Sequence, residues 1–157
     1  MNRSISREFE KYLKNNSIKL VPYQVIDRGQ LAGKVFEGIR KLSARDLRKR
    51  KSDWQPEKLS VISDWVKHSL APIAKRADVT IGQLSIAWAL QQKYIGFLIV
   101  GVTNPQYIEI NLKADSIKLS EEVIGEIDAA YKGLENTIRS TYGQSIREFR
   151  GLNQKYY

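Results

Sequence analysis

The sequence contains no cysteine and a single histidine, His68. Without cysteine the chain forms no disulfide and offers no thiolate to a metal ion, so a metal site would have to use carboxylates. The carboxylates show no ligand-like spacing, and we predict no metal site.

Long apolar runs are also missing. Nowhere does the sequence reach the roughly 18 consecutive apolar residues that a membrane-spanning helix needs. Residues 1–8 carry both charge signs and no apolar stretch, which is unlike a secretory signal peptide. We therefore expect a cytoplasmic protein with no membrane partner.

Positive charge is abundant but unevenly placed. The net charge is +9, and the excess of Lys and Arg lies in the first half of the chain. Most of it falls within residues 40–51, where Asp46 is the one acidic residue. Such a segment can attract phosphate groups or an acidic partner, although it is also compatible with a solvated loop or helix face. No aromatic or glycine pattern of a nucleic-acid module accompanies it, so we expect no nucleic-acid partner.

Apolar spacing in the first third predicts a helix followed by a strand. Residues 4–13 have the helical period, with Ser4 or Ser6 as a possible cap. Residues 18–26 are rich in Ile, Leu, Val and Tyr and predict a buried strand, which Pro22 should bend or place at a sheet edge. Residues 27–55 have no steady period and predict a long basic loop with room for one helical turn.

The remaining residues alternate between helical patterns and one further strand. Pro56 suits the first turn of a helix that Pro72 should kink, and its predicted buried face is Leu59, Ile62, Val66, Leu70 and Ile73. Thr80 and Gln83 have the spacing of a capping box at the start of another helix. A strand is predicted over residues 96–100, helices from Pro105 and from Ser120, and a partly helical C-terminal tail over 138–157.

This order of elements is typical of parallel strands joined by crossover helices. Two parallel strands cannot close a barrel, and their outer edges leave backbone groups to be satisfied by a neighbour. We therefore expect a partner, either another copy in a homo-oligomer or a separate chain that supplies the missing strands.

Two segments resemble motifs of the aldo-keto reductases. Residues 21–34, VPYQVIDRGQLAGK, resemble the seventh-strand motif, usually P-Y-S-P-L-x-x-G-L-L-x-G-K. Residues 99–111, IVGVTNPQYIEIN, are similar to the eighth-strand motif I-P-G-x-x-x-x-x-Q-x-x-E-N. Residues 80–90 are also similar to the family's aQlaLaW helix, and the resemblance covers nearly all of the chain. It implies an α/β fold in which residues 1–157 form one partial TIM barrel, the C-terminal third of a reductase barrel.

The resemblance also implies a set of residues that bind NADP. Tyr23 takes the position that stacks on the nicotinamide, and Gln24, Ile26 and Arg28 take positions around the pyrophosphate. Gly101 and Thr103 match contacts at the adenosine phosphate end, where the helix after Pro105 would present free N–H groups. Asn111 matches the last residue of the second motif.

Several positions depart from the family pattern in ways that predict weak or lost NADP binding. Gln24 stands where Ser is common, and Asp27 places a negative charge beside the expected path of the pyrophosphate. Tyr107 replaces the usual Gln or Arg. Ile110 replaces an acid that accepts a hydrogen bond from the adenine, and an isoleucine side chain has no acceptor.

The family's catalytic Asp, Tyr, Lys and His come from its first four strands, which have no counterpart in this sequence. His68 falls within a predicted helix away from both motifs, and we predict no catalytic residue. The leading hypothesis is part of an NADP-dependent oxidoreductase acting on aldehydes or ketones, inactive by itself. The alternatives are a scaffold or regulatory subunit that docks an acidic partner at residues 40–51, and a truncated gene remnant.

Overall fold

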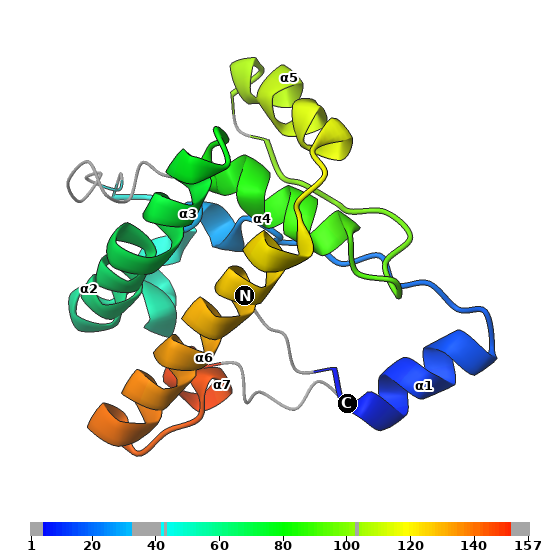
Figure 1. Ribbon diagram of the computed structural model, residues 1–157. Coiled ribbons are helices and arrows are strands. Elements are labelled where there is room, and N and C mark those ends of the chain that lie inside the picture. Colours follow the sequence, from blue (N-terminus) through cyan, green and yellow to red (C-terminus); the bar gives the residue numbers. More distant parts are fainter. Residues whose placement is uncertain (1–4, 33–41, 43, 103, 152–157) are drawn as a thin grey trace.

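The structure is a computed structural model that describes residues 5–32, 42, 44–102 and 104–151. Helices make up most of the described chain (Figure 1). Helices α2, α3, α4, α6 and α7 gather into one body, while α1 stands to one side and α5 lies above α4 in this view. No helix among the described residues is long and apolar enough to cross a membrane.

Two extended segments run parallel where the sequence predicts strands. Leu20 bridges Ile95 and Tyr23 bridges Ile99, both in parallel sense. The Leu20 amide donates to the Tyr94 carbonyl at 2.8 Å, and the Ile99 amide donates to the Pro22 carbonyl at 2.9 Å. The prediction that these segments lie side by side is confirmed.

The prediction of two regular strands is wrong for the described chain, because the pairing stops at these isolated bridges. Pro22 has no N–H to give, and a parallel pair without further strands on its edges gains few ladder hydrogen bonds. The predicted partial TIM barrel is therefore not confirmed: the described residues contain two parallel segments but no continuous sheet.

Helix α1, Arg7–Asn15, is shorter at its start than the sequence predicts. Of the two possible caps, Ser6 is the one used, since its side chain accepts a hydrogen bond from the Phe9 amide. Phe9 and Tyr12 stack on each other and are about half exposed, at 45% and 55%. This helix thus shows an aromatic surface to the solvent.

The long helical segment after Pro56 consists of α2, Pro56–Trp65, a π turn η4, Val66–Leu70, and α3, Ala71–Arg76. The interruption follows from Pro72, which cannot donate to a carbonyl four residues back. The preceding amide, that of Ala71, instead donates to Val66, five residues back. All members of the predicted apolar face are buried: Leu59, Ile62, Val66, Leu70 and Ile73.

Helix α4, Ile81–Leu90, begins with the predicted capping box between Thr80 and Gln83. After the second extended segment come α5, Gln106–Leu112, and η5, Lys113–Ser116. The Gln83 amide group donates to the Ile110 carbonyl at 3.0 Å and so connects α4 to α5. Gln91 exchanges two hydrogen bonds with the Leu119 backbone and fixes the chain between η5 and the next helix.

The C-terminal elements complete the core. Helix α6, Glu121–Tyr142, is capped by Ser120 and ends at Gly143 in the left-handed conformation. The predicted C-terminal tail over 138–157 is partly helical, as expected, but it is not a separate element from residue 138 on, because Ile138 is fully buried within α6. Helix α7, Ile146–Phe149, follows and buries Phe149 against the same core.

The segment predicted as one long loop, 27–55, contains three short 3-10 turns in its described part. These are η1, Asp27–Gly29, η2, Leu47–Arg50, and η3, Ser52–Trp54. Residues 33–41 and 43 lie outside the described residues. The end of the segment is packed rather than free, because Asp53 and Trp54 are buried at 1% and 8% exposure.

Candidate functional site

A cavity of about 1320 Å³ lies at the end of the two parallel segments. Six of the seven predicted cofactor residues line it: Tyr23, Gln24, Ile26, Arg28, Gly101 and Asn111. The seventh, Thr103, lies outside the described residues. The cavity is larger than the roughly 300–1,000 Å³ of most small-ligand pockets, as an extended ligand would require.

The first wall of the cavity is the turn that follows the first extended segment. Gln24, Asp27, Arg28 and Gly29 all have positive φ angles, from 54° to 99°. Such a run is uncommon outside glycine and marks a turn whose shape is imposed by its surroundings. It leaves the Tyr23 ring 71% exposed at the cavity edge, where a flat ligand could stack on it.

The turn uses several of its own backbone donors. The amides of Asp27 and Gly29 donate to Gln24 and Ile26, and those of Gln30 and Leu31 donate to Asp27 and Ile26. The backbone donors expected from the family resemblance are therefore partly engaged within the turn. An anion at this wall would have to be held mainly by side chains.

Basic side chains at this wall could hold such an anion. Arg28, Arg48 and Lys49 line the cavity together with the acidic Asp46. Arg48 contacts Asp46 through two guanidinium nitrogens, at 2.9 and 2.5 Å, and lies 4.8 Å from the centre of the Trp54 ring. Hydrogen bonds from Arg48 lower the pKa of Asp46 to about 2, so this carboxylate remains ionised. Part of the predicted basic segment 40–51 thus faces the cavity.

The opposite wall comes from the second extended segment and α5. Gly101, Val102, Tyr107, Ile110 and Asn111 line it. The predicted anion contact at the start of the helix after Pro105 is not available in this conformation. The Gln106 and Tyr107 amides donate to Asn104, and the Ile108 amide donates to Pro105.

Asp27 is buried, whereas the sequence predicts it beside the path of the pyrophosphate. It is 6% exposed and forms a buried ion pair with Arg150 rather than facing the cavity as a free charge. Burial by itself would raise the pKa of Asp27, but nearby positive charge, including that of Arg150, lowers it below its usual value. The negative charge of Asp27 therefore lies in a buried ion pair, and the predicted repulsion of a pyrophosphate stays a prediction.

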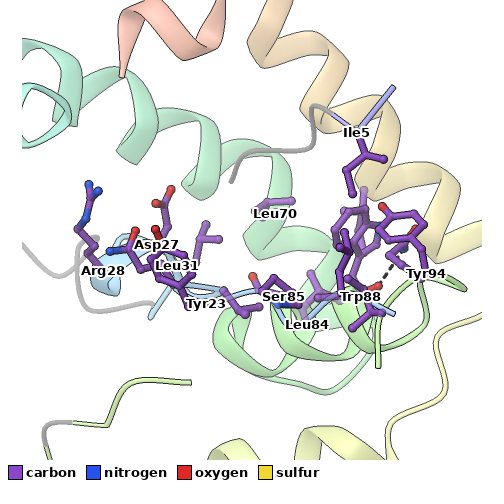
Figure 2. A pocket seen from close by; sticks show the side chains of 18 of the residues that line it. Ile5, Tyr23, Asp27, Arg28, Leu31, Leu70, Leu84, Ser85, Trp88 and Tyr94 are labelled. Carbon is purple, nitrogen blue, oxygen red and sulfur yellow. Dashed lines mark hydrogen bonds between the residues drawn. The ribbon is translucent and has the colours of Figure 1, made fainter. Parts of the chain in front are cut away.

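A second cavity, of about 360 Å³, lies on the other side of the turn (Figure 2). Asp27 and Arg28 stand at one end, and Trp88 and Tyr94 at the other. Tyr23, Gln24 and Arg28 line both cavities, so the turn forms the partition between them. No cluster of metal-binding side chains occurs in the described residues.

Comparison with known proteins shows the family to which the chain belongs. The family model described as "Aldo/keto reductase family" matches residues 1–132. The chain belongs to the aldo/keto reductase family. Its α6 beyond residue 132, and all of α7, lie past the matched part.

Among similar aldo/keto reductases, the "Aldo-keto reductase yakc [NADP(+)]" of Schizosaccharomyces pombe is 30% identical over 80% of this chain and 36% of its own length. The "Probable aldo-keto reductase 1" of Glycine max is 31% identical over 80% of this chain and 35% of its own length. "Protein tas" of Escherichia coli is 24% identical over 84% and 37%. The chain thus spans little more than a third of the length of these relatives.

Sequence reasoning missed Asp53 and Arg150 as members of the site. Asp53 lay inside the segment predicted as a loop, and Arg150 inside the predicted tail. The burial of Phe149 and the capping box at Ser145 and Glu148 fix the helical turn that carries Arg150. The Ser-x-x-Glu spacing was the one signal available in the sequence, but it does not reveal what Arg150 contacts.

Proposed function

We propose that this chain forms the nucleotide-binding wall of an NADP-dependent aldo/keto reductase barrel whose remaining strands lie outside residues 1–157. The observation that carries the proposal is a large cavity lined by residues of both family motifs. A relative named for NADP(+) covers the same region, which supports this choice of nucleotide.

The proposed roles follow from the geometry. Tyr23, exposed at the cavity edge, would stack on the nicotinamide ring. Arg28 and Arg48 would contact phosphate oxygens through charge-assisted hydrogen bonds, since the turn's own amides are partly engaged. Asn111 would reach the adenine end. Ile110 on the same wall offers no acceptor, which should keep the affinity modest.

Reduction of an aldehyde or ketone needs a proton donor near the hydride acceptor. The family resemblance predicts that the catalytic residues come from strands outside this sequence. In the proposed reaction residues 1–157 therefore hold and orient NADPH, while the proton donor comes from the part of the barrel outside these residues. Val21, Phe97 and Ile99 along the parallel segments are 39–65% exposed and would be covered by that part of the barrel.

Titration with NADPH tests the nucleotide site. Trp54 lines the cavity and should report binding as a decrease in tryptophan fluorescence. We expect the substitution Y23A to weaken binding about 2- to 10-fold, the usual value of one aromatic stacking contact. The ring is mostly exposed, so the free energy of unfolding should stay unchanged.

The matched control for this titration is Y12A. Tyr12 is also exposed, but it lies on α1 and outside the residues that line the cavity. Y12A should bind NADPH as the unaltered chain does. No fluorescence change with any variant up to millimolar NADPH would refute the proposed nucleotide site.

A second function, docking of an acidic partner, is favoured by the exposure of Arg45, Lys49, Arg50 and Lys51. These residues lie together in the described part of the basic segment. A complex that forms without nucleotide and weakens with salt would support this scaffold function, since screened surface charges lose their attraction.

A further inference from the structure

Arg28, which lines the large cavity, is held by Asp53, a residue that lines neither of the two cavities. A single nitrogen of the Arg28 guanidinium group, Nη1, donates to both carboxylate oxygens of Asp53, at 3.2 and 2.9 Å. A guanidinium group has five N–H donors on three nitrogens, and a side-by-side pair with a carboxylate would occupy two of those nitrogens. In the part of the chain that the structure describes, Nε and Nη2 of Arg28 have no hydrogen-bond partner. Both nitrogens are therefore available to a ligand.

Asp53 is itself fixed in place. Its side chain is 1% exposed, and its Oδ2 atom accepts a further hydrogen bond from Nη2 of Arg150 at 2.8 Å. Its backbone carbonyl accepts a hydrogen bond from the side-chain amide of Gln30 at 2.9 Å, and Gln30 is fully buried. The carboxylate of Asp53 therefore has one defined position relative to the turn that carries Arg28.

The backbone of Arg28 also restricts where its side chain can go. Arg28 has φ 55° and ψ 21°, and its carbonyl accepts a hydrogen bond from Nη1 of Arg48 at 3.3 Å. The Arg28 side chain is 20% exposed, so an anion in the cavity can reach it. Moving Arg28 away from Asp53 would remove a partner from a buried carboxylate, which is costly. A ligand must therefore meet the guanidinium group where Asp53 holds it.

Asp53 has two opposing effects on an anion in the cavity. Its negative charge repels the anion whether or not Arg28 is present, and a charge one side chain away changes affinity about 3-fold. Its hydrogen bonds also fix the Arg28 side chain, whose loss of rotamer freedom would otherwise oppose binding by roughly 10-fold. The second effect is the larger one, and it is transmitted by Arg28 alone.

We infer that Asp53 is a positioning residue for anion binding: it holds Nη1 of Arg28 and so presents Nε and Nη2 to a phosphate group at the cavity wall. The inference rests on the proposed nucleotide site. It assigns a role to a residue that lies outside both family motifs. Asp53 does not touch the ligand and acts through Arg28.

The test is a double-mutant cycle on the full chain, with affinity for NADPH measured by calorimetry. R28Q should weaken binding roughly 10-fold, the effect of one charge-assisted hydrogen bond. D53N keeps the shape of the side chain and removes its charge. With Arg28 present, D53N should bind NADPH about 3-fold more weakly, because lost positioning exceeds lost repulsion. In the R28Q background, D53N should bind about 3-fold more tightly, because only the repulsion is lost.

The opposite directions in the two backgrounds distinguish positioning from other roles. A purely electrostatic role would make D53N tighten binding by the same factor in both backgrounds. A purely structural role would weaken binding in both. Either result would overturn the inference. A greater gain with Arg28 present than without it would also overturn it, because Asp53 would then compete with the ligand for Arg28.

A second variant leaves Asp53 unaltered and decides the question if D53N does not fold, as judged by its urea unfolding transition. R28K keeps the positive charge of a partly exposed side chain but replaces three nitrogens with one. Because Asp53 holds that one nitrogen, R28K should bind NADPH within about 3-fold of R28Q. An affinity equal to that of the unaltered chain would contradict the positioning role.

The matched control is D64N, which removes one negative charge at an exposed position of α2 that lines neither cavity. It should leave the affinity for NADPH unchanged in both backgrounds. If the unaltered chain does not bind NADPH, the proposed nucleotide site fails and the inference fails with it. If the unaltered chain binds NADPH and D53N acts in the same direction in both backgrounds, the inference alone fails.

Discussion

Asp27 carries a negative charge in a place where water cannot stabilise it. Its folded-state pKa is lowered below the ordinary 3.8 because nearby positive charge outweighs the cost of burial. A carboxyl group with a lowered pKa stabilises the fold at pH values above its unfolded pKa. That contribution is lost as the pH falls through the folded pKa.

We therefore expect the free energy of unfolding to be level near neutral pH and to fall below about pH 4. D27N should lower stability at pH 7, because Arg150 loses a partner, and should make the acid dependence shallower. Some dependence remains, since Asp46 has a pKa of about 2. Urea unfolding from pH 7 to pH 2 measures both effects.

The control for this pH series is D64N, which removes an exposed carboxylate on α2 and leaves the buried ion pair of Asp27 intact. Its acid dependence should match that of the unaltered chain. A D27N curve parallel to that of the unaltered chain would show that Asp27 contributes no acid-labile stability.

At the level of elements, α4 connects the site to the core. Its N-terminus carries a complete capping box, with the Gln83 amide donating to Thr80 Oγ1 at 3.1 Å and the Thr80 amide donating to Gln83 Oε1 at 3.0 Å. The Gln83 side chain also donates a hydrogen bond to α5, which forms part of the opposite wall of the large cavity. The start of α4 therefore affects both stability and the wall that carries Asn111.

We expect T80A to lower the free energy of unfolding by about 1 kcal/mol, the usual cost of losing a threonine cap. The loss should appear as a shifted urea midpoint with an unchanged slope. T141A, at an exposed position in the last turn of α6, is the matched control and should change stability by less than about 0.5 kcal/mol. Equal effects of the two substitutions would contradict the capping role.

Helices were the elements that local sequence could predict. The caps at Ser6, Thr80 and Ser120 and the apolar face of Leu59 through Ile73 depend on contacts within a few residues, and the structure has them. Local sequence could not tell whether the two predicted strands form a regular sheet, because a strand is stabilised by neighbours far away in sequence or on another chain. Residues 18–26 have strand-like composition but only one parallel neighbour among the described residues.

Prediction of the candidate site from local sequence has the same limit. Both motifs gave the residues of the large cavity, since each motif lies next to a parallel segment and the two segments are adjacent. Arg150 is 97 residues from Asp53 and 123 from Asp27. No local pattern specifies such contacts, which exist because α7 packs Phe149 into the core formed by α2, α3, α4 and α6.

At the scale of the whole molecule, the described residues form a helical body and a surface of exposed apolar side chains. The parallel segments expose Tyr23, Phe97 and Ile99 at 57–71%, and α1 exposes its aromatic pair. Apolar groups gathered along extended backbone with open outer edges are typical of a surface that further strands cover. This is the basis for proposing that binding and chemistry are divided between this chain and the rest of the barrel.

The most direct measurement follows binding and oxidation of NADPH in one sample, with an aldehyde in excess. We expect NADPH to quench Trp54 fluorescence without being consumed, because in the proposed division this chain binds the nucleotide and the proton donor lies in the rest of the barrel. A full-length family member assayed in parallel shows that the aldehyde is a competent substrate. Oxidation of NADPH by the purified chain alone would contradict the division of roles, and absence of both binding and oxidation would contradict the nucleotide site.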